Sequence, residues 1–270
     1  MAGKELAKGV AVVTGGAGGM GSATARKLAQ AGWPELLLCD IDAGRLEAVA
    51  APLRQDGTKV DILAGDVADP AFPGQLLAAL RDRPIGALVH TAGISPLMGS
   101  AERILAVNLD ATVRLVDAIR DRMAPGSAAV LFASNSSYFP MPPEADAAFR
   151  ARLPPEGTAA LAHLAPRPEL AYPLSKLGVR ALVKREARSF GTRGARLVSL
   201  SPGAIDTPMT KGEVPNSEMA RRMIENAAIP RMGHADELAA VAVFLCSAAA
   251  SFVTGTDILV DGGQTTAAGF

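Results

Sequence analysis

The stretch G-V-A-V-V-T-G-G-A-G-G-M-G, residues 9–21, decides the fold class. A short β-branched run, 9–14, leads through clustered glycines into an alanine-rich stretch of helical period. Closely spaced glycines let a backbone approach a pyrophosphate, whose charge then meets the free N–H groups and positive dipole at a helix start. The stretch therefore predicts a strand, a dinucleotide-binding turn and a helix. A strand-to-helix turn that binds no ligand is the alternative interpretation of the glycines alone.

Short leucine-rich or β-branched runs recur along the chain and alternate with longer stretches of helical period. This alternation is typical of a parallel sheet covered by helices on both faces. We therefore expect a three-layer, Rossmann-like α/β fold in which residues 1–270 form a single dinucleotide-binding domain around one sheet of seven strands. The expected strands are 9–14, 35–40, 59–64, 86–91, 128–133, 195–200 and 256–261, and the expected helices are 19–31, 42–55, 71–81, 101–123, 171–190 and 235–249.

Residues 138–170 interrupt this regular alternation. Prolines at 140, 142, 143, 154, 155, 166 and 168 punctuate alanine-rich pieces. Because prolines at this density end any long helix, we expect one or two short helices on the surface. We interpret 138–170 as an inserted helical segment between the fifth strand and the following helix.

Composition excludes several classes of partner. Lys plus Arg and Asp plus Glu each number 27, so no net charge favours nucleic acid or a membrane surface, and a small neutral ligand is the more natural partner. The longest apolar run, 238–250, is too short to span a bilayer, which needs about 20 residues. The start lacks the apolar segment of a secretory signal and the two cysteines are far apart, so we expect a cytoplasmic protein. The three histidines show no ligand spacing, so we expect no metal.

Asp40 ends the second expected strand, 19 residues after Gly21. An acidic side chain at that place accepts hydrogen bonds from both hydroxyls of an adenosine ribose. It would repel a 2′-phosphate, and neither the glycine turn nor Ile41 offers an arginine or lysine to receive one. The position therefore favours NAD over NADP as cofactor. A helix N-cap is the alternative role for Asp40.

Tyr172 and Lys176 lie four residues apart in A-Y-P-L-S-K, within an expected helix, so they share one helix face. A free tyrosine titrates at about 10, which leaves little phenolate at neutral pH. A nearby ammonium and an oxidised nicotinamide ring both favour the anion. The pair is therefore suited to take the proton of an alcohol while hydride leaves its carbon.

The glycine turn, the strand-end aspartate and Y-x-x-x-K together resemble the short-chain dehydrogenase/reductase family, and the resemblance covers almost the whole chain. It implies the strand order 3-2-1-4-5-6-7, hydride transfer at alcohols and carbonyls, and a homo-oligomer, either a dimer or a tetramer. His90 and Thr91 stand where the family has the two asparagines of N-N-A-G. The resemblance implies cofactor contacts from Gly15, Ala17, Gly18, Gly19, Met20, Asp40, Ile41, Asp66, Val67, Ala92, Gly93, Tyr172, Lys176, Pro202, Gly203, Ile205 and Thr207.

The same resemblance assigns the catalytic roles. Tyr172 is the acid/base, Lys176 holds the ribose and lowers the pKa of the tyrosine, and Asn108 holds a water for proton relay. A serine polarises the substrate carbonyl, as in a small oxyanion hole. Aligning the end of the fifth strand places Ser134 there, with Ser136 as the alternative and as a residue that contacts substrate.

The separation of serine and tyrosine, 172 − 134 = 38 residues, departs from most members of the family. It resembles the branch of bacterial 3α-hydroxysteroid dehydrogenase/carbonyl reductase. Together with a substrate-lid segment at 207–232, the insertion predicts an apolar rim suited to a bulky apolar or steroid-like substrate. The residues of this rim are Phe139, Met141, Phe149, Leu153, Leu161 and Leu164 in the insertion, and Met209, Met219, Met223, Ile224 and Met232 in the lid segment. The alternative is that they occupy ordinary core or subunit-contact positions.

These observations predict an NAD-dependent oxidoreductase that interconverts a secondary alcohol and a ketone. One alternative is an epimerase or dehydratase on the same scaffold, which would retain its cofactor through purification. A second alternative is a non-catalytic protein that senses NAD and binds a protein partner, which would have no use for Tyr172 and Lys176 together.

Overall fold

Seven parallel strands form one sheet in the order β3-β2-β1-β4-β5-β6-β9, in a computed structural model that describes residues 7–150 and 157–269. The expected sheet and its strand order are confirmed, because β9 is the seventh strand of this sheet along the chain. The strands are β1 Val10–Thr14, β2 Glu35–Asp40, β3 Lys59–Ala64, β4 Ile85–His90, β5 Met123–Phe132, β6 Arg196–Pro202 and β9 Asp257–Val260.

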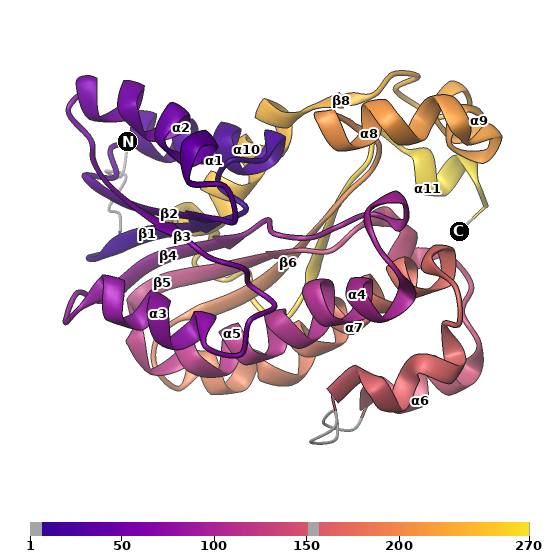
Figure 1. Cartoon of the computed structure of the whole chain (residues 1–270), viewed down its shortest axis with the longest axis horizontal. Coiled ribbons are helices and arrows are strands. Elements are labelled where there is room, and N and C mark those ends of the chain that lie inside the picture. The colour runs from indigo at the N-terminus through magenta and orange to yellow at the C-terminus, as the bar shows by residue number, and fades with distance from the viewer. Residues whose placement is uncertain (1–6, 151–156, 270) are drawn as a thin grey trace.

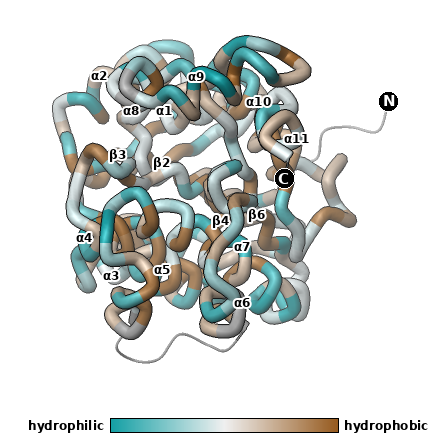
Figure 2. The backbone as a smooth tube through the Cα atoms, turned by 90° about the vertical axis from the view of Figure 1, so that its right-hand side faces the viewer, coloured by the Kyte–Doolittle hydropathy of each residue, from teal (hydrophilic) through white to brown (hydrophobic). Residues whose placement is uncertain are grey.

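Helices cover both faces of the sheet, which confirms the three layers (Figures 1 and 2). Alternate residues of β1 show how the sheet is buried: Val10 and Val12 pack on one face, whereas Ala11 and Val13 pack on the other. No helix in the described part of the chain is both long and apolar enough to cross a bilayer. One face carries α1 Gly19–Gln30, α2 Ala43–Gln55 and α10 Ala235–Cys246, and the other carries α3 Phe72–Leu80, α5 Ala111–Ile119 and α7 Pro168–Gly191.

The expected helix 101–123 is interrupted. It consists of α4 Ala101–Leu105, a π-helical turn Ala106–Asp110 and α5, followed by a short 3-10 turn and then by β5. β5 starts at Met123 rather than at residue 128, and its pairing with β4 shifts register between Ile85 and Ala87. Pro125 and Gly126 lie in the irregular part, and Gly126 has a φ of +81°. Residues of these types do not form a strand pattern, so the sequence did not predict this early start.

Segment 207–232 is closed at its base by a short parallel pair that was not predicted, β7 Ile205–Asp206 and β8 Gly233–His234. Between these strands lie α8 Pro208–Glu213, a 3-10 turn Val214–Asn216 and α9 Glu218–Glu225. Strands of two residues are too short to give a periodic signal. Near α9 the last described helix, α11 Gln264–Ala267, completes this end of the molecule (Figure 1).

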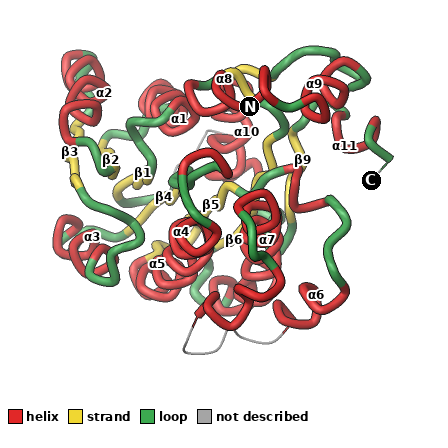
Figure 3. Tube along the Cα trace, turned by 45° about the vertical axis from the view of Figure 1, so that its right-hand side comes forward, coloured by secondary structure: helices red, strands yellow, loops and turns green. Residues whose placement is uncertain are grey.

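The insertion contains the expected short helices, α6 Pro143–Arg150 and a 3-10 helix Gly157–Leu164. Figure 3 shows α6 beyond α7, far from α9. Phe149 and Leu161 are buried in the same core cluster as α7, so the expectation that these two side chains form a substrate rim is wrong. Asp110 fixes the insertion, because its carboxylate accepts from Thr158 N at 2.9 Å and from Thr158 Oγ1 at 2.8 Å. Leu153 lies outside the described residues.

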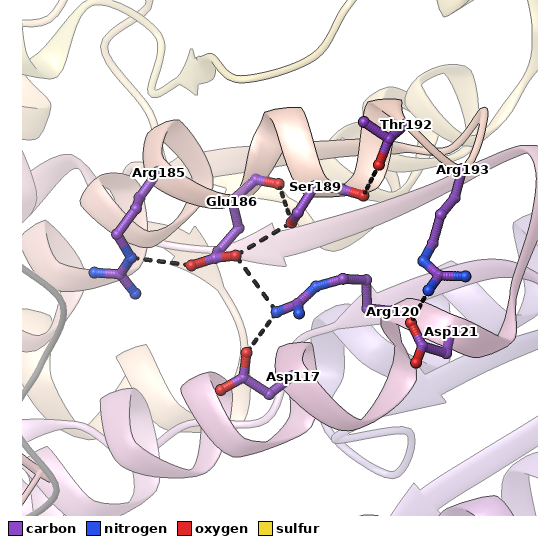
Figure 4. A network of polar contacts seen from close by, with 8 residues as sticks. All are labelled: Asp117, Arg120, Asp121, Arg185, Glu186, Ser189, Thr192 and Arg193. Atoms are coloured by element: carbon purple, nitrogen blue, oxygen red, sulfur yellow. Dashed lines mark hydrogen bonds and ion pairs between the residues drawn. The ribbon is translucent and has the colours of Figure 1, made fainter.

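A polar network joins the C-terminal half of α7 to the end of α5 (Figure 4). Arg120 Nη2 lies 2.5 Å from Asp117 Oδ1 and 3.4 Å from Glu186 Oε2, and Ser189 Oγ donates to the same carboxylate at 3.2 Å. Burial alone would raise the pKa of Glu186, but the hydrogen bonds from Arg185 and Ser189 and the nearby arginines hold that pKa below its ordinary value. The network fixes the far end of the helix that carries Tyr172 and Lys176.

Candidate active site

The glycine turn packs against the end of β4. Gly15 has a φ of +70°, and a Cβ there would lie 2.7 Å from Ala92 N. A Cβ on Gly21 would lie 2.0 Å from Gly15 O. Contacts this close exclude any side chain at either position. The two glycines therefore bring β1, α1 and the Ala92-Gly93 segment together at one edge of the sheet.

The start of α1 is built to receive an anion. Its N-cap is Gly18, which offers no side chain, and the first turn holds no acidic residue. The N–H groups of Gly19, Met20 and Gly21 begin the helix and have no intrahelical acceptor. Free N–H groups and the helix dipole together suit a pyrophosphate. This part of the chain therefore fits the dinucleotide that the glycine spacing predicts.

Asp40 lies beside this turn at the end of β2. Its Oδ2 accepts from Ala17 N at 3.0 Å and its Oδ1 accepts from Ile41 N at 2.8 Å. The N-cap of α2 is Asp42, whose side chain accepts from the backbone N–H of Arg45, so the alternative role of Asp40 as that N-cap is wrong. Each carboxylate oxygen of Asp40 keeps a further lone pair for a ribose hydroxyl.

Arg45 is a residue of this site that sequence reasoning missed. Its Nη2 donates to Ala17 O at 2.9 Å, which places a guanidinium beside the turn that Asp40 holds. The signal lay in its position in the first turn of α2, because such a side chain can fold back over the preceding strand end. Arg45 is the cation within the described site that lies closest in sequence to Asp40.

Asp66 and Val67 follow β3 at the same edge of the sheet. Asp66 Oδ1 accepts from Ala68 N at 2.8 Å, and Oδ2 accepts from Arg103 Nη2 at 2.6 Å. Burial alone would raise the pKa of Asp66, but Arg103 and the Ala68 N–H hold that pKa below its ordinary value. The carboxylate therefore stays ionised and can accept a further hydrogen bond.

Tyr172 and Lys176 lie on α7, as the spacing predicts. Lys176 Nζ is 5.7 Å from the centre of the Tyr172 ring and donates to Phe132 O at 3.0 Å. Burial lowers the pKa of Lys176 to about 8. A buried amine that changes charge near neutral pH is suited to a site that moves protons. The bond to Phe132 also ties α7 to the end of β5.

Ser134 follows the end of β5 and caps a 3-10 turn, Asn135–Tyr138. Ser134 Oγ accepts from Ser136 N at 3.2 Å and from Ser136 Oγ at 3.1 Å, so both candidate serines belong to one hydroxyl cluster. Ser137 differs, because its hydroxyl donates to Ser134 O at 2.6 Å. The cluster begins two residues after Phe132, whose carbonyl accepts from Lys176 Nζ, so Ser134 lies close in sequence to a contact with the face of α7 that carries Tyr172 and Lys176.

Asn108 lies in the π-helical turn between α4 and α5, a distortion common at functional sites. Its Oδ1 accepts from Ile94 N at 2.8 Å and its Nδ2 donates to Ile94 O at 2.9 Å. A Cβ on Gly93 would lie 3.1 Å from Asn108 Oδ1 and 3.4 Å from Lys176 Nζ. Gly93, Asn108 and Lys176 therefore converge at the Ala92-Gly93 segment, which the glycine turn contacts on its other side.

His90 connects this region to the glycine turn. Its Nδ1 lies 2.6 Å from Thr14 Oγ1 and its Nε2 lies 2.9 Å from Thr112 Oγ1, which in turn donates to Asn108 O at 2.8 Å. Because Thr112 gives its proton to that carbonyl, Nε2 of His90 carries the ring proton and Nδ1 accepts from Thr14. Burial, with a smaller contribution from the charge of Lys176, lowers the pKa of His90 to about 3. His90 is therefore neutral and fixed in one tautomer.

The predicted lid segment approaches the same edge of the sheet. A Cβ on Gly19 would lie 2.9 Å from Thr207 Cγ2, so the start of the segment contacts the glycine turn. Thr207 is buried as the N-cap of α8, and Met209 is half-buried. Pro202 ends β6, Gly203 packs against Asp261, and Ile205 is buried in β7.

A cavity of about 520 Å³ lies between α9 and α11. Met219 and Met223 line it with Arg222, so two of the methionines that the sequence assigned to a substrate rim do border an open space. Among residues 7–150 and 157–269, no group of three or more His, Cys, Asp or Glu side chains converges to hold a metal ion.

Comparison with known proteins assigns this arrangement to a family. Residues 9–145 match the family model described as short chain dehydrogenase, and residues 158–265 match the model described as enoyl-(acyl carrier protein) reductase. The chain is 32% identical to short-chain dehydrogenase/reductase bsc3 of Alternaria brassicicola, over 92% of this chain and 93% of that protein. It is 33% identical to D-threitol dehydrogenase of Mycolicibacterium smegmatis, over 95% and 92%. A solved short-chain dehydrogenase/reductase from Brucella melitensis superposes with a TM-score of 0.78 at 27% identity, covering 97% of this chain and 98% of that one.

Proposed function

Because the chain belongs to the short-chain dehydrogenase/reductase family, we propose that it is an NAD-dependent oxidoreductase that interconverts a secondary alcohol and a ketone. The observation that carries the proposal is the convergence at Lys176. Its buried ammonium lies beside the Tyr172 ring, bonds the carbonyl of Phe132 and borders Gly93. A tyrosine, a lysine and a strand-end serine are thereby held around the end of a dinucleotide-binding turn.

The nicotinamide, when bound, accepts or supplies the hydride. Tyr172 takes the hydroxyl proton of the alcohol, or returns it to the ketone oxygen, as a general base or acid. Lys176 favours the phenolate through its charge and holds the nicotinamide ribose. Ser134 donates a hydrogen bond to the substrate oxygen, and Ser136 supports Ser134 and borders the substrate. Asn108, which lies beside Gly93 and Lys176, would hold a water that relays the proton.

NAD is the cofactor that this site favours. The Asp40 carboxylate, beside the Ala17 N–H of the glycine turn, would accept hydrogen bonds from the adenosine ribose hydroxyls and would repel a 2′-phosphate. The pyrophosphate would meet the N–H groups at the start of α1. Asp66 and Val67 would border the adenine of a bound NAD, and Ala92 and Gly93 would border the part of the cofactor that joins its two nucleosides. Pro202, Gly203, Ile205 and Thr207, together with Tyr172 and Lys176, would border the nicotinamide.

The substrate is a small-molecule alcohol or ketone, and the lid segment 207–232 would cover it. Met209, half-buried close to the buried Thr207, supports an apolar or bulky substrate. The cavity between α9 and α11 adds no support, because none of its lining residues is a catalytic candidate. The burial of Phe149 and Leu161 removes these two side chains from that support, whereas Phe139, Met141 and Leu164 are half-buried. One relative is named for D-threitol, a polyol. A screen of polyols against cyclic and steroid alcohols, read as NADH formation, separates these substrate classes.

Replacing Tyr172 with phenylalanine tests the proposal. The change removes the proton acceptor and leaves the ring, so hydride transfer should fall about 10²- to 10⁴-fold. The dissociation constant for NADH should stay within about twofold, because the ring still packs beside Lys176. Stopped-flow absorbance measures the first quantity and NADH fluorescence titration the second. Turnover equal to the wild type would refute the role of Tyr172 and with it the proposed chemistry.

A further inference from the structure

Ser134 and Tyr172 are separated by 38 residues of chain, so the short connection that would otherwise hold them in register is missing. Arg180 lies on the same face of α7, because residues 172, 176 and 180 are spaced at i, i+4 and i+8. Its side chain is 17% exposed, so it is held within the protein rather than extended into solvent.

The guanidinium of Arg180 contacts the 3-10 turn that Ser134 caps. Nη1 donates to Ser137 O at 2.8 Å and to Ser137 Oγ at 3.3 Å. The same guanidinium lies 3.7 Å from the centre of the Tyr138 ring, within the range of a cation–π contact. Ser137 Oγ donates to Ser134 O, so the residue that Arg180 bonds is itself bonded to the candidate catalytic serine.

A buried carboxylate completes the contact. Asp257 on β9 is 4% exposed, and its Oδ2 lies 3.7 Å from Arg180 Nε and accepts from Tyr138 OH at 2.7 Å. Its Oδ1 accepts from Ser201 Oγ at 3.0 Å. Burial and the bond to Asp257 raise the pKa of Tyr138 to about 12, so this phenol remains a neutral donor. Tyr138 is therefore turned to the edge of the sheet and not available as an acid/base.

We propose that Arg180, held by Tyr138 and Asp257, is a positioning residue that fixes the Ser134 turn against the face of α7 that carries Tyr172 and Lys176. The inference rests on the proposed function, because it holds that Arg180 positions Ser134 for the proposed hydride transfer. Arginine suits the task better than lysine, since its planar fork can bond a carbonyl and stack on a ring at once. The bond from Lys176 to Phe132 O holds the end of β5 against α7, and the Arg180 contact holds the turn that follows it, so the two together fix the serine and the tyrosine despite the 38 residues between them.

The first test compares Arg180→Met with Arg188→Met, a change of the same type at an exposed position on the last turns of the same helix. A serine displaced by about 1 Å costs on the order of 10²-fold in rate, so kcat of Arg180→Met should fall about 10- to 100-fold. The dissociation constant for NADH and its stoichiometry should stay within about twofold of the wild type. Arg188→Met should match the wild type in each quantity.

A double-mutant cycle separates positioning from general destabilisation. If Arg180 acts through Ser134, adding Arg180→Met to Ser134→Ala should cost less than about threefold in kcat, because the group that it positions is already gone. If Arg180 only supports the fold, the losses should multiply. Multiplicative losses, or an Arg180→Met variant as active as Arg188→Met, overturn the inference.

Amide exchange tests the same contact without turnover. The N–H groups of Ser136, Ser137 and Phe139 bond within the turn, to Ser134 Oγ, Ser134 O and Ser136 O. Their exchange should be about tenfold faster in Arg180→Met than in Arg188→Met. Should Arg180→Met not fold, Tyr138→Phe removes one hydroxyl and should change exchange in the same direction. Unchanged exchange overturns the inference even in an active enzyme, whereas a wild-type chain with no hydride transfer on any alcohol counts against the proposed function instead.

Discussion

Asp40 is the residue on which the proposed cofactor preference depends. Asp40→Ser removes the charge that repels a 2′-phosphate, and Arg45 beside Ala17 then becomes available to attract one. Juxtaposed like charges cost several kcal/mol, and each 1.4 kcal/mol is about tenfold, so kcat/KM with NADPH should rise about a hundredfold. Steady-state rates with NADH and NADPH at several concentrations measure the change.

Asp42→Ser is the matched control for that substitution. It removes a carboxylate two residues away, and serine still caps α2. The control should keep the cofactor preference of the wild type. A preference in Asp40→Ser that matches Asp42→Ser would show that Asp40 does not border the ribose.

His90 should make the folded protein sensitive to acid. Its pKa is about 3 in the folded chain, against about 6.5 in an unfolded one. Between these two pH values His90 is protonated in the unfolded state and neutral in the folded state. The free energy of unfolding therefore falls as pH drops below about 6.5. The loss is about 1.4 kcal/mol per pH unit, or about 2 kcal/mol at pH 5.

His90→Asn removes that titration and keeps an acceptor for Thr14. Urea unfolding of both proteins between pH 7.5 and 5 should show the wild type losing about 2 kcal/mol more than the variant over this range. Carboxylates and the other histidines titrate in both proteins and cancel in the difference. Parallel pH profiles would mean that His90 is protonated in the folded state.

At the scale of elements, the strands and α7 could be predicted because each has a local cause. A strand buried on both faces is a continuous apolar run, and the Tyr172–Lys176 spacing defines one helix face. The π-helical turn at Asn108 has no such signal, because the contact made there joins Asn108 to Ile94, 14 residues earlier in the chain. The two-residue strands β7 and β8 form only because the ends of the lid segment meet.

The insertion shows the same division between local and distant causes. Its prolines predicted short helices, and short helices are present. Its attachment depends on Asp110 and Thr158, which lie 48 residues apart, and no periodic pattern predicts such a pair. Arg45 and Arg180 were missed for the same reason. A charged side chain in a helical pattern usually faces solvent, and only the fold reveals the strand end or turn that it bonds.

For the whole molecule, the candidate site lies where segments distant in sequence meet at one edge of the sheet. The glycine turn, the Asn108 turn, the Ser134 turn and α7 are linked through Gly93, Lys176 and the carbonyl of Phe132. The motifs predicted which segments take part, because each carries a residue type that the chemistry requires. The links between segments depend on packing, so they could be seen only in the folded chain.

Cofactor binding should stabilise the whole molecule. A ligand that binds only the folded state stabilises it by RT ln(1 + [L]/Kd), so NADH at 100 times its Kd should add about 2.7 kcal/mol. For a chain of this size that corresponds to a rise in Tm of about 5–10 °C. Differential scanning calorimetry of desalted protein measures the rise, and NADPH at the same concentration should give a smaller one because Asp40 opposes the 2′-phosphate. An epimerase or dehydratase would keep its cofactor through desalting. Purified protein that already carries NAD, and whose Tm does not respond to added NADH, would therefore favour that alternative over the proposed dehydrogenase.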